Sequence, residues 1–159
     1  MKNKIKTYAF FIIFTLAVGG LSALLTMGNM DIYDTINKPP FAPPSIVFPI
    51  VWGILYVLMA VGASKVYISG KQEGIYIFPA MLFYFSQLAV NFFWSIIFFN
   101  LQNFLFSFLW LLLLLVLVFA MSLKFYRVNR VAGFLQLSYI AWIILAGVLN
   151  YAVFVLNVQ

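Results

Sequence analysis

Five long apolar runs follow one another along the chain, and short polar segments separate them. They cover approximately residues 5–27, 46–68, 75–99, 104–123 and 131–155. An apolar segment of about 20 residues can cross the hydrocarbon core of a membrane as a helix. The pattern therefore predicts an all-α integral membrane protein, in which residues 1–159 form one domain, a bundle of five transmembrane helices.

Two details of the pattern refine this topology. The first run follows several lysines, as in a secretory signal peptide, but it is longer than a signal h-region of about 7–15 residues, and no A-x-A-like site follows it. The third and fourth runs are separated only by NLQN, which predicts a tight helical hairpin. The odd number of runs, without an internal repeat, argues against a transporter built from two similar halves.

The charged residues predict how the bundle is oriented. All basic residues except Lys38 gather on one side: around the start of the first run, around the loop after the second, and in the loop after the fourth. Lys and Arg are concentrated in cytoplasmic loops. We therefore expect a bacterial cell-membrane protein whose N-terminus is cytoplasmic, whose C-terminus is outside and whose first loop faces outward.

Composition supports a lipid environment and excludes several kinds of chemistry. Hydrophobic residues make up 66% of the chain and charged residues only 8%, against about 25% charged in soluble domains. The chain has no Cys and no His, which excludes disulfides, thiol nucleophiles, Ser-His-Asp triads, the usual zinc sites and the two commonest haem ligands. The net charge of +6 does not predict a nucleic-acid partner, because the charges lie in small groups between apolar runs.

The segment NKPPFAPPSIVFPIVW, residues 37–52, contains five of the six prolines of the chain. Proline fixes φ near −65° and disfavours a helix at the residue before it. The first loop, residues 28–45, is therefore predicted to be a stiff, extended lid, with Ser45 as the N-cap of the second helix. Because a loop that merely joins two helices does not need this stiffness, we expect the lid to cap a ligand site.

Polar and aromatic residues of three predicted helices reach similar depths beneath this lid. At a rise of about 1.5 Å per residue, Trp52 and Trp94 lie roughly 8–9 Å from the outer ends of their helices. On the same basis Asn150 lies about 8 Å deep and Asn91 about 13 Å deep, while Trp142 falls near the middle of the membrane. The sequence thus predicts a semi-polar, aromatic pocket in the outer half of the bilayer.

Helical spacing places further residues on the same faces. Trp52 and Tyr56 lie four residues apart, as do Gln87 and Asn91, so each pair shares one face of its helix. On the fifth helix, one stripe combines Tyr139, Trp142, Ala146 and Asn150. No acidic residue lies within any predicted span, which argues against a proton-coupled drug antiporter.

A structural role is the alternative for each of these residues. Asn and Gln in membrane helices often join neighbouring helices by hydrogen bonds, and Trp and Tyr often anchor helices at the membrane surface. Trp142 fits the anchor role least, because its predicted position is at mid-depth. The Gly19-Gly20 pair indicates close helix packing more strongly than ligand contact.

Three stretches of the chain resemble the TspO/translocator protein family, whose members are also called tryptophan-rich sensory proteins or peripheral-type benzodiazepine receptors. The stretches are KPPFAPPSIVFPIVWGILYVLM, QLAVNFFWSIIFF and YIAWIILAGVLNY. The resemblance implies a five-helix bundle, commonly a homodimer, that binds porphyrins such as protoporphyrin IX and other haem-like tetrapyrroles, together with synthetic benzodiazepine-site ligands. Carried over by motif, it implies a ligand-binding cavity lined by Tyr33, Pro43, Trp52, Asn91, Trp94, Trp142, Ala146 and Asn150.

Two departures from the family pattern bear on the site. The sterol motif of animal members has a basic residue soon after the tyrosine that ends the fifth helix, and none follows Tyr151 here, which argues against sterol recognition. Many members have proline before the tyrosine at the start of the site stripe, where this chain has Ser138. The fifth helix is therefore expected to be straighter than in those relatives.

Three functions remain open on the sequence. The first is a membrane receptor or sensor that binds a porphyrin without any metal or other cofactor, with Lys38 of the lid pairing with a propionate. The second is a light- and oxygen-dependent enzyme that degrades porphyrin, with Trp52 and Trp142 as electron donors. The third is a porphyrin transporter, which the lack of a charged coupling residue disfavours.

Overall fold

We describe residues 2–157 from a computed structural model. Within this range the chain is helical and contains no strand. The elements are α1 (Lys2–Thr26), η1 (Met27–Asn29), α2 (Ile32–Thr35), α3 (Val47–Glu73), α4 (Phe78–Ser95), the π-helical turn η2 (Ile96–Asn100), α5 (Phe104–Val128), α6 (Arg130–Leu135) and α7 (Leu137–Asn157).

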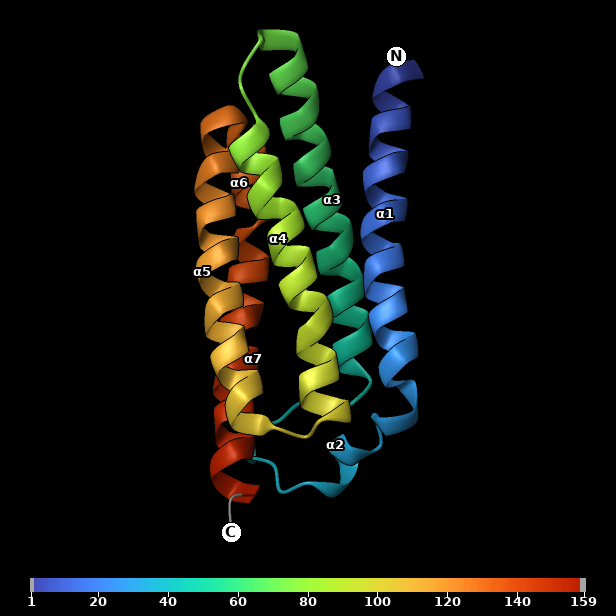
Figure 1. Cartoon of the computed structure of the whole chain (residues 1–159), viewed down its shortest axis with the longest axis vertical. Helices are drawn as coiled ribbons and strands as arrows, with labels where there is room; N and C mark the ends of the chain where they lie inside the picture. The colour runs from blue at the N-terminus through green and yellow to red at the C-terminus, as the bar shows by residue number, and fades with distance from the viewer. Residues whose placement is uncertain (1, 158–159) are drawn as a thin grey trace.

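The long helices run roughly parallel or antiparallel to one another and form an elongated bundle, with the N-terminus at one end and the C-terminus at the other (Figure 1). Five segments are long and apolar enough to cross a membrane: α1 with η1, α3, α4 with η2, α5, and α6 with α7. Large apolar side chains remain exposed along the sides of the bundle, for example Ile13, Val116 and Val148. Such a surface suits contact with lipid, so the predicted five-helix membrane bundle is confirmed.

Two helices extend further than the apolar runs predict. Helix α3 continues to Glu73 and α5 continues to Val128, whereas the runs end near residues 68 and 123. The reason is that hydrophobicity marks the hydrocarbon core, whereas the helix continues beyond it on residues such as Lys71 and Arg127. Helix α3 stops at Gly74, whose φ of 67° is a left-handed conformation that glycine adopts without strain.

The fifth span, predicted as one helix, is interrupted by a single residue, Gln136. Helix α6 ends at Leu135 and α7 begins at Leu137. At the break, the backbone N–H of Gln136 donates to the carbonyl oxygen of Gly133, and its side-chain Nε2 donates to that of Ala132, at 3.1 Å each. These bonds tighten the turn, so the helix is interrupted without a proline.

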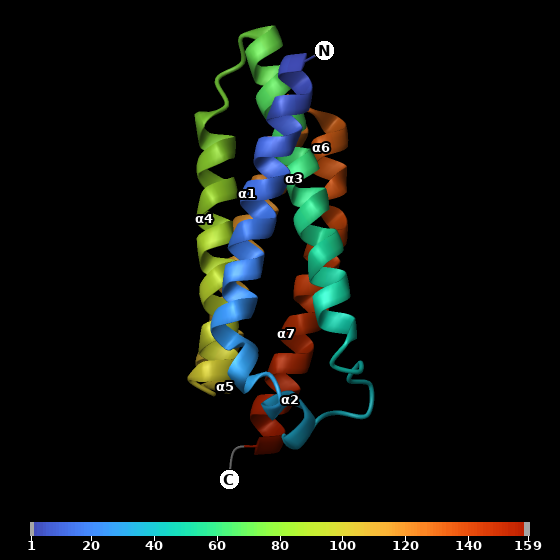
Figure 2. The same ribbon diagram turned by 90° about the vertical axis from the view of Figure 1, so that its right-hand side faces the viewer.

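The lid contains more helix than its prolines predict. The one-turn helix α2 interrupts the expected extended loop, and the chain becomes irregular only from Ile36 onward (Figure 2). The predicted N-cap at Ser45 is wrong: the residue before α3 is Ile46, and no side chain caps the helix. The lid is fastened to the end of α7, because the backbone N–H of Asn37 donates to Oδ1 of Asn157 at 3.0 Å and Nδ2 of Asn157 donates back to the carbonyl oxygen of Asn37 at 2.9 Å.

Candidate functional site

A cavity of about 340 Å³ lies at the lid end of the bundle, between α1, α3, the end of α4 and the lid. Aromatic side chains dominate its wall, and small residues of α1 form one side. The lining residues are Gly19, Ser22, Ala23, Met30, Asp31, Tyr33, Asp34, Ser45, Ile46, Phe48, Pro49, Trp52, Tyr56, Trp94, Ser95 and Phe99. We refer to this space as the lid cavity.

Trp52 is the centre of the aromatic wall. Its ring centroid lies 5.7 Å from that of Tyr56, 6.1 Å from that of Trp94 and 5.9 Å from that of Tyr139. The contact with Tyr56 confirms that the two residues share a face of α3. These distances are in the range in which aromatic rings attract one another, so the wall is held together by ring contacts from three helices.

A chain of buried hydrogen bonds supports this wall from behind. The hydroxyl of Tyr56 donates to Oδ1 of Asn91 at 3.0 Å, and Nδ2 of Asn91 donates to the hydroxyl of Tyr139 at 2.6 Å. The Tyr139 hydroxyl in turn donates to Oε1 of Gln87 at 2.9 Å. Asn91 therefore does not line the cavity; it fixes the orientation of Tyr56, which does. The network also confirms that Gln87 and Asn91 share one face of α4.

Glycine in α1 permits the close approach of Tyr56. A Cβ atom on Gly19 would lie only 2.1 Å from Cε2 of the Tyr56 ring, so the ring occupies the space that any larger residue would need. Gly20, in contrast, has no atom within 4 Å of such a Cβ. Gly19 thus allows close helix packing, as the sequence indicated, and it also borders the lid cavity.

Asn150 positions the second tryptophan of the wall. The indole Nε1 of Trp94 donates to Oδ1 of Asn150 at 3.3 Å, and Nδ2 of Asn150 donates to the carbonyl oxygen of Phe104 at 2.8 Å. Asn150 is buried and joins α7 to α4 and α5. Its side chain is therefore occupied by contacts within the protein.

A second, much smaller cavity of about 20 Å³ lies beside the first, towards α7. Ala146 and Asn150 line it. Four residues border both cavities and form the partition between them, namely Tyr33, Phe48, Trp94 and Phe99. We call these four residues the partition.

Trp142 lines neither cavity. Its ring is partly buried and meets the ring of Phe48 at a centroid distance of 5.8 Å. Its Nε1 is buried without a hydrogen-bond partner among the described residues. Phe48 therefore stands between Trp142 and the lid cavity.

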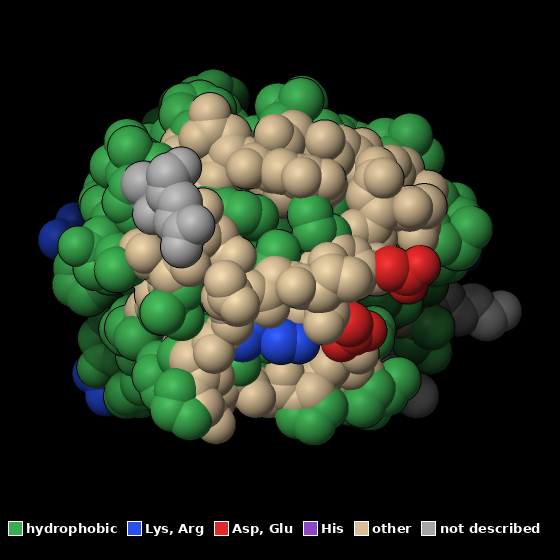
Figure 3. Space-filling model, turned by 90° about the horizontal axis from the view of Figure 1, so that it is seen from below, with side chains coloured by type: hydrophobic (Ala, Val, Ile, Leu, Met, Phe, Trp, Pro, Cys, Tyr) green, Lys and Arg blue, Asp and Glu red, His purple; other side chains and the backbone are tan. Residues whose placement is uncertain are grey.

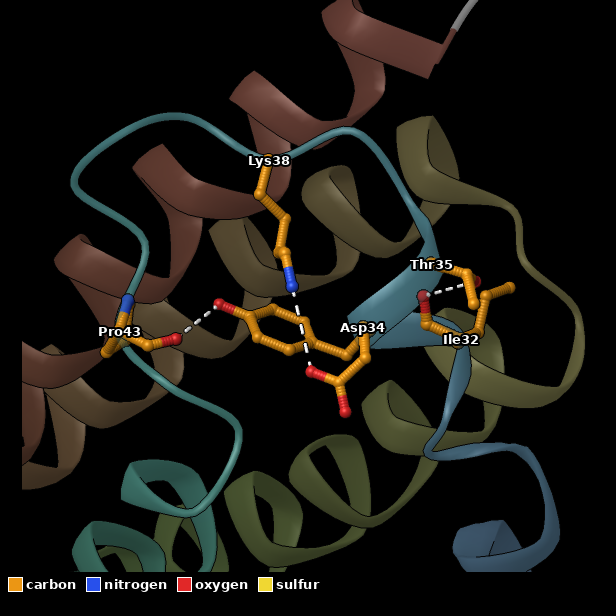
Figure 4. A network of polar contacts seen from close by, with 6 residues as sticks. Ile32, Asp34, Thr35, Lys38 and Pro43 are labelled. Atoms are coloured by element: carbon orange, nitrogen blue, oxygen red, sulfur yellow. Dashed lines mark hydrogen bonds and ion pairs between the residues drawn. The ribbon is translucent and has the colours of Figure 1, made fainter.

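The lid is folded around Tyr33. The Tyr33 hydroxyl donates to the carbonyl oxygen of Pro43 at 2.9 Å, and its ring meets the edge of Phe48 at 5.0 Å. Lys38 extends across the lid, with its Nζ 4.5 Å from the Tyr33 ring centroid and 3.7 Å from a carboxylate oxygen of Asp34 (Figure 4). Burial and, to a smaller extent, the charge of Asp34 raise the pKa of the Tyr33 phenol, so it remains a hydrogen-bond donor.

The structure thus divides the residues suggested by the sequence into three groups. Tyr33, Trp52 and Trp94 meet in the lid cavity, and Ala146 and Asn150 border the smaller cavity. Pro43, Asn91 and Trp142 support or neighbour these residues without lining either space. The stripe on the fifth span does face the site, because Tyr139 touches Trp52 and Trp142 touches Phe48.

Sequence reasoning missed several lining residues. Phe48 lies four residues before Trp52, so the spacing that links Trp52 to Tyr56 also places Phe48 on that face. No sequence pattern links Asp31 and Asp34 to a cavity, so these two lining residues could not be predicted. Within residues 2–157 no group of three His, Cys, Asp or Glu side chains could hold a metal ion. The side chains that line the lid cavity offer a ligand apolar, aromatic, hydroxyl and carboxylate groups.

Comparison with known proteins identifies the family of this chain. The family model described as the TspO/MBR family matches residues 11–156. "Tryptophan-rich protein TspO" of Chlorobaculum tepidum is 33% identical over 158 residues, which cover 99% of each chain. "Protein CrtK" of Rhodobacter capsulatus is 32% identical over 151 residues, covering 94% of this chain and 92% of the relative.

The similarity reaches beyond bacteria. "Translocator protein" of Bos taurus is 32% identical over 137 residues, covering 84% of this chain and 79% of the relative. The family match runs from within the first apolar helix to the end of the fifth and includes every residue that lines the lid cavity. This chain therefore belongs to the TspO/MBR family of integral membrane proteins.

Proposed function

We propose that this protein is a membrane receptor that binds flat, largely apolar ligands in the lid cavity, among them porphyrins such as protoporphyrin IX and benzodiazepine-site compounds. The observation that carries the proposal is the wall of Trp52, Tyr56 and Trp94 rings beneath a folded lid. Indole and phenol faces stack on planar ring systems, and few polar groups are needed to orient such a ligand.

The size of the cavity sets a condition on porphyrin binding. At about 340 Å³ the lid cavity lies at the low end of the range of roughly 300–1,000 Å³ for small-molecule pockets. A tetrapyrrole is broader than a drug-sized ligand and needs the space on both sides of the partition. Rotation of Phe48 would join the two cavities and bring Ala146 and Trp142 within reach of the ligand.

Replacing Phe48 with alanine is therefore expected to strengthen protoporphyrin IX binding by about three- to tenfold, because the bound conformation no longer requires the ring to move. The measurement is a porphyrin titration of the purified protein in detergent, in the dark. Phe119→Ala removes an exposed ring on α5 and serves as the control. It should leave the affinity for protoporphyrin IX unchanged. Absence of saturable binding to the wild type would overturn the receptor proposal for porphyrins, and unchanged affinity in Phe48→Ala would exclude the Phe48 ring as the obstacle.

A second candidate function is porphyrin degradation under light and oxygen. One observation favours it: Trp52 contacts three further oxidisable rings, those of Tyr56, Trp94 and Tyr139. Such a cluster could donate an electron to the photoexcited porphyrin and share the resulting radical cation among its rings, while oxygen accepts the electron from the reduced porphyrin and acts as the oxidant that attacks the ring. The same titration under illumination separates the two functions, because a receptor leaves the porphyrin spectrum intact whereas an enzyme consumes porphyrin over repeated turnovers.

We further propose that the lid faces the outside of the cell and the N-terminus the cytoplasm. The support is that every basic residue of the described chain except Lys38 lies towards the end of the bundle opposite the lid. Because the chain has no cysteine, single cysteines introduced at Asn37 and at Lys71 can be tested in intact cells with a membrane-impermeant thiol reagent. Labelling at residue 37 but not at residue 71 is expected, and the opposite pattern would reverse the orientation.

A further inference from the structure

Two acidic residues lie where the lid cavity meets solvent. Asp31 and Asp34 both line the cavity, and both are exposed. Figure 3 shows the lid end of the molecule, where two red acidic groups lie to the right of a small blue basic patch. The only other acidic residue of the chain, Glu73, ends α3 at the opposite end of the bundle. The acidic character is thus concentrated at the cavity.

The single basic residue of the lid does not neutralise this mouth. Lys38 pairs with Asp34 at 3.7 Å and lies over the Tyr33 ring, and it is not among the residues that line the cavity. No other ion pair within 4.0 Å joins the described residues, so Asp31 has no cationic partner there. Lys38 therefore offsets the charge of Asp34, and the carboxylate of Asp31 remains at the mouth without a cationic partner among the described residues.

The wall beneath the carboxylates has the same electrostatic preference. The faces of Trp, Tyr and Phe rings carry negative charge density and attract cations, Trp most strongly. Tyr33, Trp52, Tyr56 and Trp94 all border the space. An aromatic wall topped by carboxylates is suited to an ammonium group attached to an apolar body, whereas it repels a carboxylate on the ligand.

We propose that the lid cavity selects hydrophobic cations, with the aromatic body of the ligand against Trp52 and its ammonium group at Asp31 and Asp34. This proposal rests on the receptor function proposed above and names the charge of the preferred ligand. It has a consequence for porphyrins: the propionates must turn away from Asp31, or Lys38 must leave Asp34 to meet them. Either requirement weakens binding of the free acid relative to its uncharged ester.

Three ligands of one shape test the selection. They share a naphthylmethyl group and carry a trimethylammonium, an uncharged tert-butyl or a carboxylate group, and binding is measured by calorimetry on the purified full chain at low salt. The ammonium compound should bind about tenfold more tightly than its uncharged isostere, and the carboxylate should bind most weakly. The difference in affinity between the ammonium compound and its uncharged isostere should narrow as the salt concentration rises, because salt screens exposed charges.

Variants at the mouth of the lid cavity show which residues cause the preference for the ammonium compound. Asp31→Asn should weaken the ammonium compound about three- to tenfold more than it weakens the uncharged compound, and the unfolding transition of the variant in detergent reports whether it is folded. Lys38→Met should strengthen the ammonium compound, because it releases Asp34 from its ion pair. Glu73→Gln is the matched control, since it removes an acidic group at the far end of α3 and should alter none of the three affinities.

The outcomes separate this proposal from the receptor function. Equal binding of the ammonium and uncharged compounds would overturn the selection while leaving the cavity as a ligand site. A preference for the ammonium compound that survives Asp31→Asn and Asp34→Asn together would overturn the role of the two carboxylates. If neither these compounds nor protoporphyrin IX bound, the receptor function itself would fail.

Discussion

Replacing Trp52 with alanine is expected to weaken ligand binding by about thirtyfold, equivalent to about 2 kcal/mol, which is typical of a central aromatic contact. The ring is in contact with Tyr56, Trp94 and Tyr139, so its loss removes both a face for the ligand and the element that holds the other rings in place. The measurement is the affinity for protoporphyrin IX and for an uncharged aromatic ligand, each in detergent.

The control for this prediction is another tryptophan in the same bundle. Trp110 lies on α5, donates its Nε1 to the carbonyl oxygen of Val90 at 2.7 Å and lines neither cavity. Trp110→Ala removes the same side chain from the protein without touching the site, and should leave the affinity of the folded fraction unchanged. Similar losses in the two variants would mean that binding depends on the general integrity of the bundle rather than on the aromatic wall.

Replacing Gly133 with alanine is expected to lower the free energy of unfolding by about 1–3 kcal/mol, the usual cost of inserting a methyl group where there is no space. A Cβ atom on Gly133 would lie 2.5 Å from Cβ, 2.7 Å from Cα and 2.8 Å from the backbone nitrogen of Tyr126. Because two of these are backbone atoms, the helices α5 and α6 would have to separate. The separation would also strain the hydrogen bond from Oγ of Ser122 to the carbonyl oxygen of Gly133.

Gly147 in α7 provides the comparison for Gly133. It is helical, and a Cβ atom there would meet nothing within 4 Å. Gly147→Ala should therefore be neutral or slightly stabilising, since alanine favours a helix over glycine by about 1 kcal/mol. The two variants can be compared by unfolding in mixed micelles with increasing denaturing detergent. Equal stability of both would show that the contact between α5 and α6 can relax at little cost.

Local properties of the sequence determined the membrane fold. Each span is long and apolar enough to cross a bilayer, which requires no knowledge of its neighbours. The sequence also determined which positions share a helix face, because the helical repeat is fixed. Tyr56 lies beside Trp52, and Gln87 is joined to Asn91 through Tyr139. Depth and face together predicted a pocket beneath the lid, and the lid cavity lies there.

The break in the fifth span shows where local reasoning fails. The apolar run of residues 131–155 predicts one helix without proline, yet the helix is interrupted at Gln136. Gln136 is fully buried, and Gly62 of α3 leaves the space that its side chain occupies, since a Cβ there would lie 2.3 Å from the Gln136 Nε2. The interruption therefore involves a neighbouring helix that no pattern within the fifth span reveals.

The sequence by itself determined that the chain forms five membrane helices and that tryptophans, tyrosines and amides lie beneath the first loop. Only the tertiary structure decided that Phe48 separates Trp142 from the cavity, that Asn91 supports the wall instead of lining it, and that Lys38 is held by Asp34. The physical reason is that length and hydrophobicity fix a helix and its depth. The rotation of each helix about its axis depends on packing against its neighbours, and apolar residues on every side of these helices leave little sequence signal for that rotation.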